Sequence, residues 1–166
     1  IPASDRNGVR TKKIDLIRDE VKLEEQAAKS DIKDITTPNG KTHRLGVITL
    51  PDFYADFKAT NAKDKNARRA SSDVLRLVQD LKDEEVEGMI IDLRNNGGGS
   101  LVEAIEIAGL FIKSGPIVQV KERRGLQVLP DADPEISYEG PLIILVNRLS
   151  ASACLLYTSD AADESR

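Results

Sequence analysis

The stretch Met89-Ile90-Ile91-Asp92-Leu93-Arg94-Asn95-Asn96-Gly97-Gly98-Gly99 decides the fold expected for this chain, because it runs from a buried strand straight into a glycine loop. A second stretch repeats this arrangement: the apolar run Pro141–Val146 leads into Asn147-Arg148-Leu149-Ser150-Ala151-Ser152-Ala153. The first loop offers backbone N–H groups and the second offers hydroxyls. Together they suggest an acyl-transfer site with a serine nucleophile.

Size and composition indicate one ordinary domain, or one domain plus part of another. The chain has 166 residues, of which 40% are hydrophobic and 31% charged, and its net charge is −4. Lys and Arg are spread along the sequence, so we expect no nucleic acid partner. No apolar run approaches the roughly 20 residues of a membrane span, so we expect none in this chain.

Cysteine and histidine occur once each, which limits the available chemistry. Cys154 alone excludes a disulfide within the chain and a cysteine-based metal site. His43 lies between a turn and a strand, where an exposed structural role is the better interpretation. We therefore expect no metal and no cofactor, and a hydrolase built on this sequence would use a base other than histidine.

The apolar pattern predicts strands alternating with helices after a turn at Thr37-Pro38-Asn39-Gly40. Before the turn, Ile14, Leu16, Val21 and Leu23 favour two short strands or one strand with a turn, half exposed. After it we expect these elements: strand Leu45–Leu50; a helix with the stripe Ala67, Ala70, Val74, Leu77, Val78 and Leu81; strand Met89–Leu93; a helix from about Leu101 to Ile112; strand Ile117–Val120; a polar excursion over 121–140; and strand Leu142–Val146, buried on both faces.

This order predicts parallel strands joined by helical crossovers, an α/β fold. In such sheets the loops at the carboxyl ends of strands line the ligand crevice. Both loops quoted at the outset follow strands in this way, so we expect them at the same edge of the sheet.

Each loop on its own has two interpretations. The glycines permit positive φ and close approach of a substrate, and the amides that open the next helix suit an oxyanion, but a flexible turn or a helix cap fits equally well. Ser150-Ala151-Ser152-Ala153 can present a nucleophile with an oxyanion donor behind it, or can simply cap a helix. No base for a serine is evident within the chain.

The ordered combination of motifs resembles the C-terminal processing peptidases, or tail-specific proteases, and among them the proteobacterial tail-specific proteases. The resemblance covers about Arg10 to Ala153. It rests on segments 90–99, 109–112, 115–120 and 146–153, with a further likeness over Leu45–Phe57.

The resemblance implies a crotonase-like, parallel-sheet protease core, here truncated and preceded by the end of a PDZ domain. It implies a Ser–Lys dyad with Ser152 as nucleophile and the backbone N–H groups of Gly98 and Ala153 as the oxyanion hole. Gly97 is the alternative donor, disfavoured because some members carry proline there, which has no N–H. The family lysine lies about 25 residues beyond the serine, in a Gly-Lys-Gly-Thr context.

The resemblance also implies substrates and a compartment. The substrates are proteins or peptides with exposed C-termini, and the compartment is periplasmic or otherwise extracytoplasmic. The chain ends 14 residues after Ser152, before the family lysine. We therefore expect the parent protein to be a serine endopeptidase and this fragment to be inactive.

The expected domain organisation has three parts. Residues 1–36 would be the end of the PDZ domain and its connector, residues 37–153 the N-terminal part of the protease core, and residues 154–166 an artefactual tail. Where family members continue Ser-Glu-Ile, this chain reads Cys154-Leu155-Leu156-Tyr157-Thr158-Ser159-Asp160-Ala161-Ala162-Asp163-Glu164, which is similar to a translated transposon-end sequencing adapter.

Two other interpretations of the whole chain stay open. A non-catalytic crotonase-like module would bind a ligand or peptide, and would lack the family Glu and Lys downstream of Ser152. A crotonase-type acyl-CoA enzyme would share the glycine-loop oxyanion hole, but it leaves Ser150-Ala151-Ser152-Ala153 unexplained.

Overall fold

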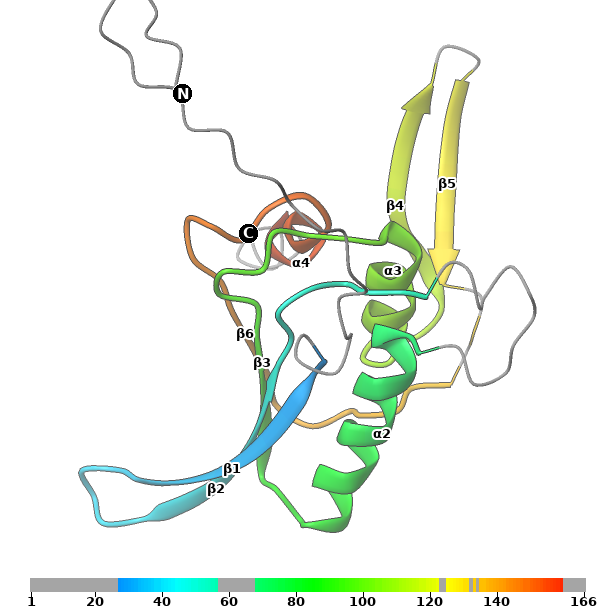
Figure 1. The fold of residues 1–166 in the computed structure, drawn as a ribbon. Coiled ribbons are helices and arrows are strands. Elements are labelled where there is room, and N and C mark those ends of the chain that lie inside the picture. Colours follow the sequence, from blue (N-terminus) through cyan, green and yellow to red (C-terminus); the bar gives the residue numbers. More distant parts are fainter. Residues whose placement is uncertain (1–26, 57–67, 123–124, 132, 134, 160–166) are drawn as a thin grey trace, which may run out of the picture.

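The computed structural model describes residues 27–56, 68–122, 125–131, 133 and 135–159. It is a mixed α/β fold in which a four-stranded sheet, ordered β1-β2-β3-β6, lies beside two helices, and a separate hairpin extends from the far side of those helices (Figure 1). The elements are β1 (Lys29–Thr36), β2 (Thr42–Thr49), α2 (Ala70–Asp83), β3 (Gly88–Asp92), α3 (Leu101–Gly109), β4 (Gly115–Glu122), β5 (Gly125–Asp131), β6 (Leu142–Leu145), the 3₁₀ turn η1 (Ser152–Leu155) and α4 (Leu156–Ser159).

The predicted turn at residues 37–40 is confirmed, and it closes a hairpin. The Gly40 N–H donates to Thr37 O at 2.8 Å, and Gly40 has φ +82°, which glycine adopts without strain. β1 and β2 pair antiparallel from Lys29↔Thr49 to Thr36↔Thr42. β1 was not predicted as a strand, and it extends the core sheet. The strands expected around residues 14–23 lie outside the described residues.

The parallel pairing predicted from the element order is confirmed for three strands. β2 pairs parallel with β3, and β3 pairs parallel with β6. The register places Thr49 opposite Asp92 and Asp92 opposite Leu145. All three strands therefore end at the same level, and the chain segments that leave them start side by side.

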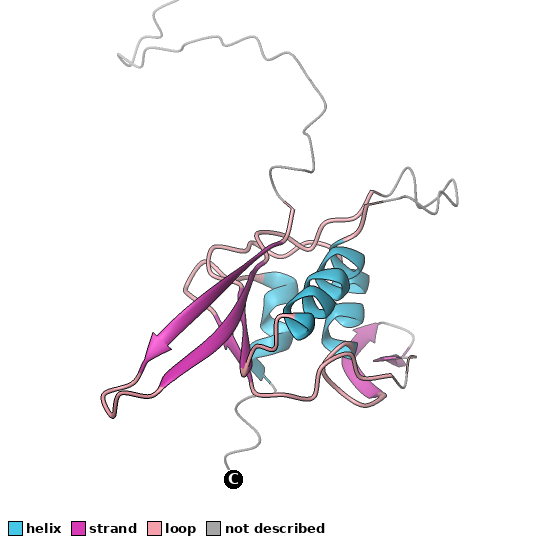
Figure 2. Ribbon diagram, turned by 90° about the horizontal axis from the view of Figure 1, so that it is seen from below, coloured by secondary structure: helices cyan, strands magenta, loops and turns pink. Residues whose placement is uncertain are grey.

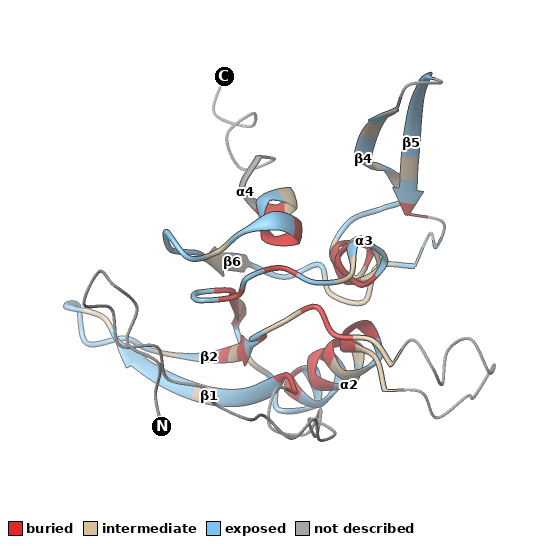
Figure 3. Cartoon of the chain, turned by 45° about the horizontal axis from the view of Figure 1, so that its top comes forward, coloured by how far each residue is buried: buried red, intermediate tan, exposed pale blue. Residues whose placement is uncertain are grey.

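α2 presents the predicted apolar stripe to the sheet. Val74, Val78 and Leu81 are buried, while Ala67 lies outside the described residues. The helix packs closely on β2, since a Cβ at Gly46 would lie 2.7 Å from Cδ1 of Leu81. Figure 3 shows the buried residues gathered where the two helices and the sheet face one another.

α3 is shorter than predicted, and it buries a different face. It ends at Gly109 rather than near Ile112, and its buried apolar residues are Ala104, Ile107 and Ala108. Val102 is 58% exposed. Apolar residues lie on most sides of this helix, so periodicity alone could not choose the face that packs.

Two expectations about the later strands are wrong. Ile117–Val120 does not join the parallel sheet: β4 pairs antiparallel with β5, so part of the expected polar excursion is a strand. Figure 2 shows the hairpin beside the helices, away from the main sheet. β6 is not buried on both faces, because it lies at the end of the sheet and Ile143 is 56% exposed. Within the described residues, no helix is long and apolar enough to cross a membrane.

A buried carboxylate joins the N-termini of the two helices. Glu103, only 1% exposed, accepts hydrogen bonds from the Ser71 N–H at 2.9 Å and from the Arg69 guanidinium at 2.8 Å. Arg69 also binds Glu106 on the outer side of α3. The carboxylate therefore accepts a hydrogen bond from one of the N–H groups that have no partner within the first turn of α2.

Replacing Glu103 by alanine is expected to destabilise the fold by about 3 kcal/mol, because it leaves Arg69 and the Ser71 amide without this partner. Glu106→Ala is the matched control: its side chain is 42% exposed, and its loss is expected to cost under about 1 kcal/mol. Thermal unfolding of the two variants checks the difference. Equal destabilisation by both would contradict this account of Glu103.

Candidate active site

The two loops predicted to share an edge are neighbours, because β3 and β6 pair directly. Asn147 Oδ1 accepts the Asn95 N–H at 3.1 Å, and Asn147 Nδ2 donates to Asn95 Oδ1 at 2.9 Å. Ser150 Oγ donates to Leu93 O at 2.8 Å. The Ala151 N–H donates to Asn96 O at 3.1 Å. Four hydrogen bonds thus tie the glycine loop to the serine loop.

Ser152 occupies a strained backbone position at the start of η1. Its φ is +55°, which side chains other than glycine rarely adopt, and Ala151 before it is extended. The residue is exposed, and Ser152 Oγ has no hydrogen-bond partner among the described residues. Such a turn between a strand and a helix presents a hydroxyl at the sheet edge, as a nucleophile requires.

Ala153 is buried directly behind this serine. It is 6% exposed, and its N–H belongs to the first turn of η1, where amides lack helical partners. No described residue accepts this N–H. It is therefore available to an oxygen that develops charge next to Ser152 Oγ.

Gly98 lies against Ser152. It is buried with φ +112°, and a Cβ built there would lie 2.7 Å from Ser152 Cβ and 3.1 Å from Oγ. Its own polar groups are both engaged: the Gly98 N–H donates to Asn96 Oδ1 at 2.8 Å, and Gly98 O accepts the Phe53 N–H at 2.9 Å. Gly97, the alternative donor, is exposed, and nothing lies within 4 Å of a Cβ built there.

Within the described part of the chain, Gly99 offers a free backbone N–H in the glycine loop, and the sequence pattern did not predict it. It bridges to Phe53, whose N–H donates to Gly98 O and whose C=O accepts the Ser100 N–H. In this pairing the N–H and C=O of Gly99 point away from Phe53. No described residue accepts the Gly99 N–H, and Gly99 lines a cavity with Ser152 and Ala153. Its place as the third glycine of the run was the only signal in the sequence.

The cavity beside Ser152 has a volume of about 440 Å³ and a mostly apolar lining. Two of its apolar lining residues, Leu155 and Leu156, belong to the segment that resembles adapter sequence. The lining residues are Gly99, Leu101, Val118, Ser152, Ala153, Leu155 and Leu156.

The segment that resembles adapter sequence packs next to this cavity. Cys154 is buried, its Sγ donates to Asn96 O at 3.3 Å, and burial raises the pKa of its thiol. Tyr157 stacks on Phe53 with ring centroids 5.9 Å apart. Burial leaves the Cys154 thiol in its neutral form, which is a poor nucleophile.

His43 lies at the other edge of the sheet from Ser152. It is near the start of β2, and its Nδ1 contacts Glu87 Oε2 at 2.8 Å. The parallel register places this start at the amino edge, opposite the serine loop. Among the described residues, no group of three or more His, Cys, Asp or Glu side chains could hold a metal ion.

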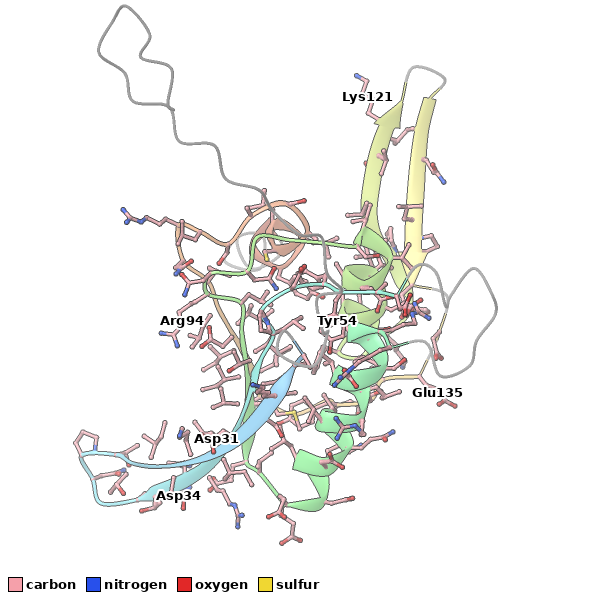
Figure 4. All side chains as sticks on the ribbon, viewed as in Figure 1. Asp31, Asp34, Tyr54, Arg94, Lys121 and Glu135 are labelled. Atoms are coloured by element: carbon pink, nitrogen blue, oxygen red, sulfur yellow. The ribbon has the colours of Figure 1, made fainter. Side chains whose placement is uncertain are left out.

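Asp92 and Arg94 form an ion pair where β3 enters the glycine loop. The Arg94 guanidinium contacts Asp92 Oδ1 at 2.9 Å and Oδ2 at 2.6 Å, and its side chain points away from the helices (Figure 4). These hydrogen bonds lower the pKa of Asp92, and burial opposes them only in part. A carboxyl group with a lowered folded pKa stabilises the fold above its unfolded pKa, and this contribution is lost as the pH falls through the folded value.

The stability difference between the wild type and Asp92→Asn is therefore expected to be constant above the unfolded pKa, about pH 4, and to shrink below it. Urea unfolding of both proteins between about pH 6 and about pH 2 measures this difference. A difference that stays constant over the whole range would show that the ion pair does not lower the Asp92 pKa.

With this geometry, the comparisons identify the family. The family model described as Peptidase family S41 matches residues 44–159, and the chain belongs to this family. Two curated relatives agree. The chain is 35% identical over 160 residues to a tail-specific protease of Haemophilus influenzae, covering 96% of this chain and 20% of the relative. It is 35% identical over 122 residues to a carboxyl-terminal-processing protease of Synechocystis, covering 74% of this chain and 26% of the relative.

Solved structures support the same fold. The photosystem II D1 C-terminal processing protease superposes with a TM-score of 0.62 at 23% identity, covering 82% of this chain and 34% of that protein. Mature CPAF superposes with a TM-score of 0.57 at 16% identity, covering 83% of this chain and 39% of that protein. The predicted fold class is thereby confirmed as the mixed α/β, parallel-sheet fold of a processing protease. The chain spans only about a fifth to a quarter of the two curated relatives.

Proposed function

We propose that the complete protein is a serine endopeptidase that degrades or processes proteins recognised by their C-terminal tails. The observation that carries the proposal is Ser152 on a positive-φ turn, between the glycine loop and the unpaired N–H of Ala153. Membership in Peptidase family S41 and the names of the curated relatives support it.

Ser152 Oγ attacks the scissile carbonyl, and its proton passes to a base. The carbonyl oxygen becomes an oxyanion that accepts the Ala153 N–H and a second N–H from the glycine loop. The sequence predicts Gly98 as that second donor. The hydrogen bond of its N–H to Asn96 Oδ1 favours the N–H of Gly99 instead, with Gly98 shaping the loop against Ser152.

The proposed base is the lysine that the family resemblance places about 25 residues beyond Ser152, outside the 166 residues of this chain. A neutral lysine takes the serine proton and returns it to the leaving amine, and water then hydrolyses the acyl-enzyme. Burial is the physical means of lowering such a lysine's pKa. We propose a periplasmic or other extracytoplasmic compartment for the protein. We also propose that residues 1–36 are the end of a PDZ domain and that residues 37–153 are the N-terminal part of the protease core.

We also propose that residues 154–164 are not encoded by the gene. Sequencing the source DNA through this region decides the question. Genomic sequence that continues as Cys154-Leu155-Leu156-Tyr157 would overturn the proposal, and a Ser-Glu continuation after Ala153 would support it.

The purified 166-residue chain is expected to leave a tailed substrate uncut, because the lysine proposed as base is not part of it, whereas the full-length protein is expected to cut it. Mass spectrometry of a model substrate with a free apolar C-terminus measures both, and the same substrate with an amidated C-terminus is the control for tail recognition. Turnover by the 166-residue chain would show that the base is not a downstream lysine. A full-length protein that binds the tail without cutting it would establish a binding module instead.

A further inference from the structure

Asn96 is a fully buried polar side chain in a loop whose neighbours are exposed. Its exposed fraction is 0%, while Asn95 and Gly97 on either side are exposed. Burying a side-chain amide without hydrogen-bond partners destabilises a folded protein by roughly 1–3 kcal/mol, according to mutational data. A buried amide in a loop therefore implies that its hydrogen bonds organise the surroundings.

The side chain uses both of its chemical functions. Asn96 Nδ2 donates to Leu50 O at 2.8 Å, just beyond β2. Asn96 Oδ1 accepts the Gly98 N–H at 2.8 Å. The amide thus connects the end of β2 to the glycine that lies against Ser152.

The Asn96 backbone connects the other two strand ends. The Asn96 N–H donates to Leu93 O at 3.1 Å, just beyond β3, and Asn96 O accepts the Ala151 N–H at 3.1 Å, one residue before Ser152. This one residue therefore contacts the chain leaving each of the three parallel strands. Among the described side chains, only that of Asn96 bonds to Leu50 O, and Asn96 shares the Gly98 N–H with the Cys154 thiol.

These bonds determine which amides face the serine. Asn96 Oδ1 accepts the Gly98 N–H, and the Phe53 N–H donates to Gly98 O. These two bonds fix the orientation of both peptide groups of Gly98. The chain then continues with the N–H of Gly99 turned away from Phe53, beside the cavity that Ser152 lines. The Asn147 side chain holds the loop at Asn95, whereas the Asn96 amide holds it at Gly98, the residue that precedes this N–H.

We propose that Asn96 is the positioning residue of this site, which aligns the glycine loop with Ser152 so that an amide of the loop is preorganised for the oxyanion. The inference rests on the proposed peptidase function and deepens it. Only a side chain with one donor and one acceptor at this length makes both contacts. Aspartate keeps the acceptor for Gly98 and places a carboxylate oxygen against Leu50 O, where the amide donor was.

The test uses the full-length protein with Asn96→Asp. Misaligning one oxyanion donor costs roughly 10²-fold or more in kcat, and KM is expected to change little. The affinity for a peptide boronate, which forms a tetrahedral adduct with serine, is expected to fall by a similar factor, while the affinity for the cleaved product peptide stays the same. A rise in KM with unchanged kcat, or unchanged boronate affinity, would overturn the proposal.

Gly46→Ala is the control for destabilisation alone. Its Cβ would press on Leu81 at 2.7 Å, in the middle of β2 and away from the loops. It is expected to lower the melting temperature and leave kcat within about twofold, since it removes no transition-state contact. If this control loses kcat as severely as Asn96→Asp, the effect of Asn96 is merely structural and the proposal fails.

A measurement on the wild type serves if Asn96→Asp does not fold. With ¹⁵N-glycine labelling, the Gly98 amide is expected to exchange slowly and to keep its chemical shift when the boronate binds, while the Gly99 amide shifts. Rapid exchange at Gly98 would overturn the proposal. Failure of the proposed function is distinguishable, because an active Ser152→Ala protein would refute the peptidase assignment whatever Asn96 does.

Discussion

Replacing Ser152 by alanine is expected to lower kcat/KM of the full-length protein by about 10⁴-fold or more, because the group that forms the acyl-enzyme is lost. The backbone around Ser152 is already strained at φ +55°, and alanine occupies this region no more easily than serine. The folded structure is therefore expected to persist, since Ser152 Oγ makes no hydrogen bond to the described residues. Cleavage of a tailed substrate and far-UV circular dichroism measure the two effects.

Two other serines serve as comparisons for this variant. Ser72→Ala, on the exposed side of α2, is expected to leave activity and folding unchanged. Ser150→Ala is expected to weaken the fold instead, because Ser150 Oγ accepts the Asn147 N–H at 2.9 Å and donates to Leu93 O at 2.8 Å. If Ser150→Ala abolished catalysis in a stable protein while Ser152→Ala retained it, the nucleophile would be misassigned.

Replacing Gly98 by alanine is expected to destabilise the loop by about 3 kcal/mol and to remove most of the activity. The positive φ of +112° contributes roughly 1–2 kcal/mol of strain. Contact of the new Cβ with Ser152 Cβ, built at 2.7 Å, adds about 1–3 kcal/mol of overpacking or displaces the serine. Thermal unfolding and kcat of the full-length protein measure the combined effect.

Gly97→Ala is the matched control one residue away. Nothing lies within 4 Å of its Cβ and its φ is not in the left-handed region, so the change is expected to be neutral or to stabilise by about 0.4–1 kcal/mol through the unfolded state. Comparable losses in the two variants would show that general rigidity of the glycine run, rather than contact with Ser152, explains the requirement for glycine.

The elements best predicted from the sequence are those with strong local signals. The run Gly88–Asp92 is apolar and bounded by turns, and α2 carries one clear stripe, so both appear close to where the pattern indicates. The hairpin partner β5 was missed because it is largely exposed and lies in a stretch rich in charged and turn residues. The exposure of β6 was missed because an apolar strand has the same sequence pattern at the edge of a sheet as in its middle.

The meeting of the two loops was predicted from the sequence, but the hydrogen bonds between and around them were not. The family resemblance implies roles for Ser152, Gly98, Gly97 and Ala153 on two loops, and the strand register brings those loops together. The hydrogen bonds of Asn96 and the pairing of Gly99 were not predicted. They depend on Leu50 and Phe53, which are more than 40 residues away along the chain and carry no motif that links them to the glycines.

The sequence by itself determined the family, the alternation of strands and helices from β2 to α3, and the glycine and serine loops at the carboxyl ends of the parallel strands. These follow from local apolar patterns and from short motifs, which act over a few residues. The tertiary structure decided which strands pair, which helix faces are buried and which loop amides remain free. Those outcomes depend on hydrogen bonds between segments distant in sequence. A backbone N–H is available to a substrate only if no acceptor of the folded chain already binds it.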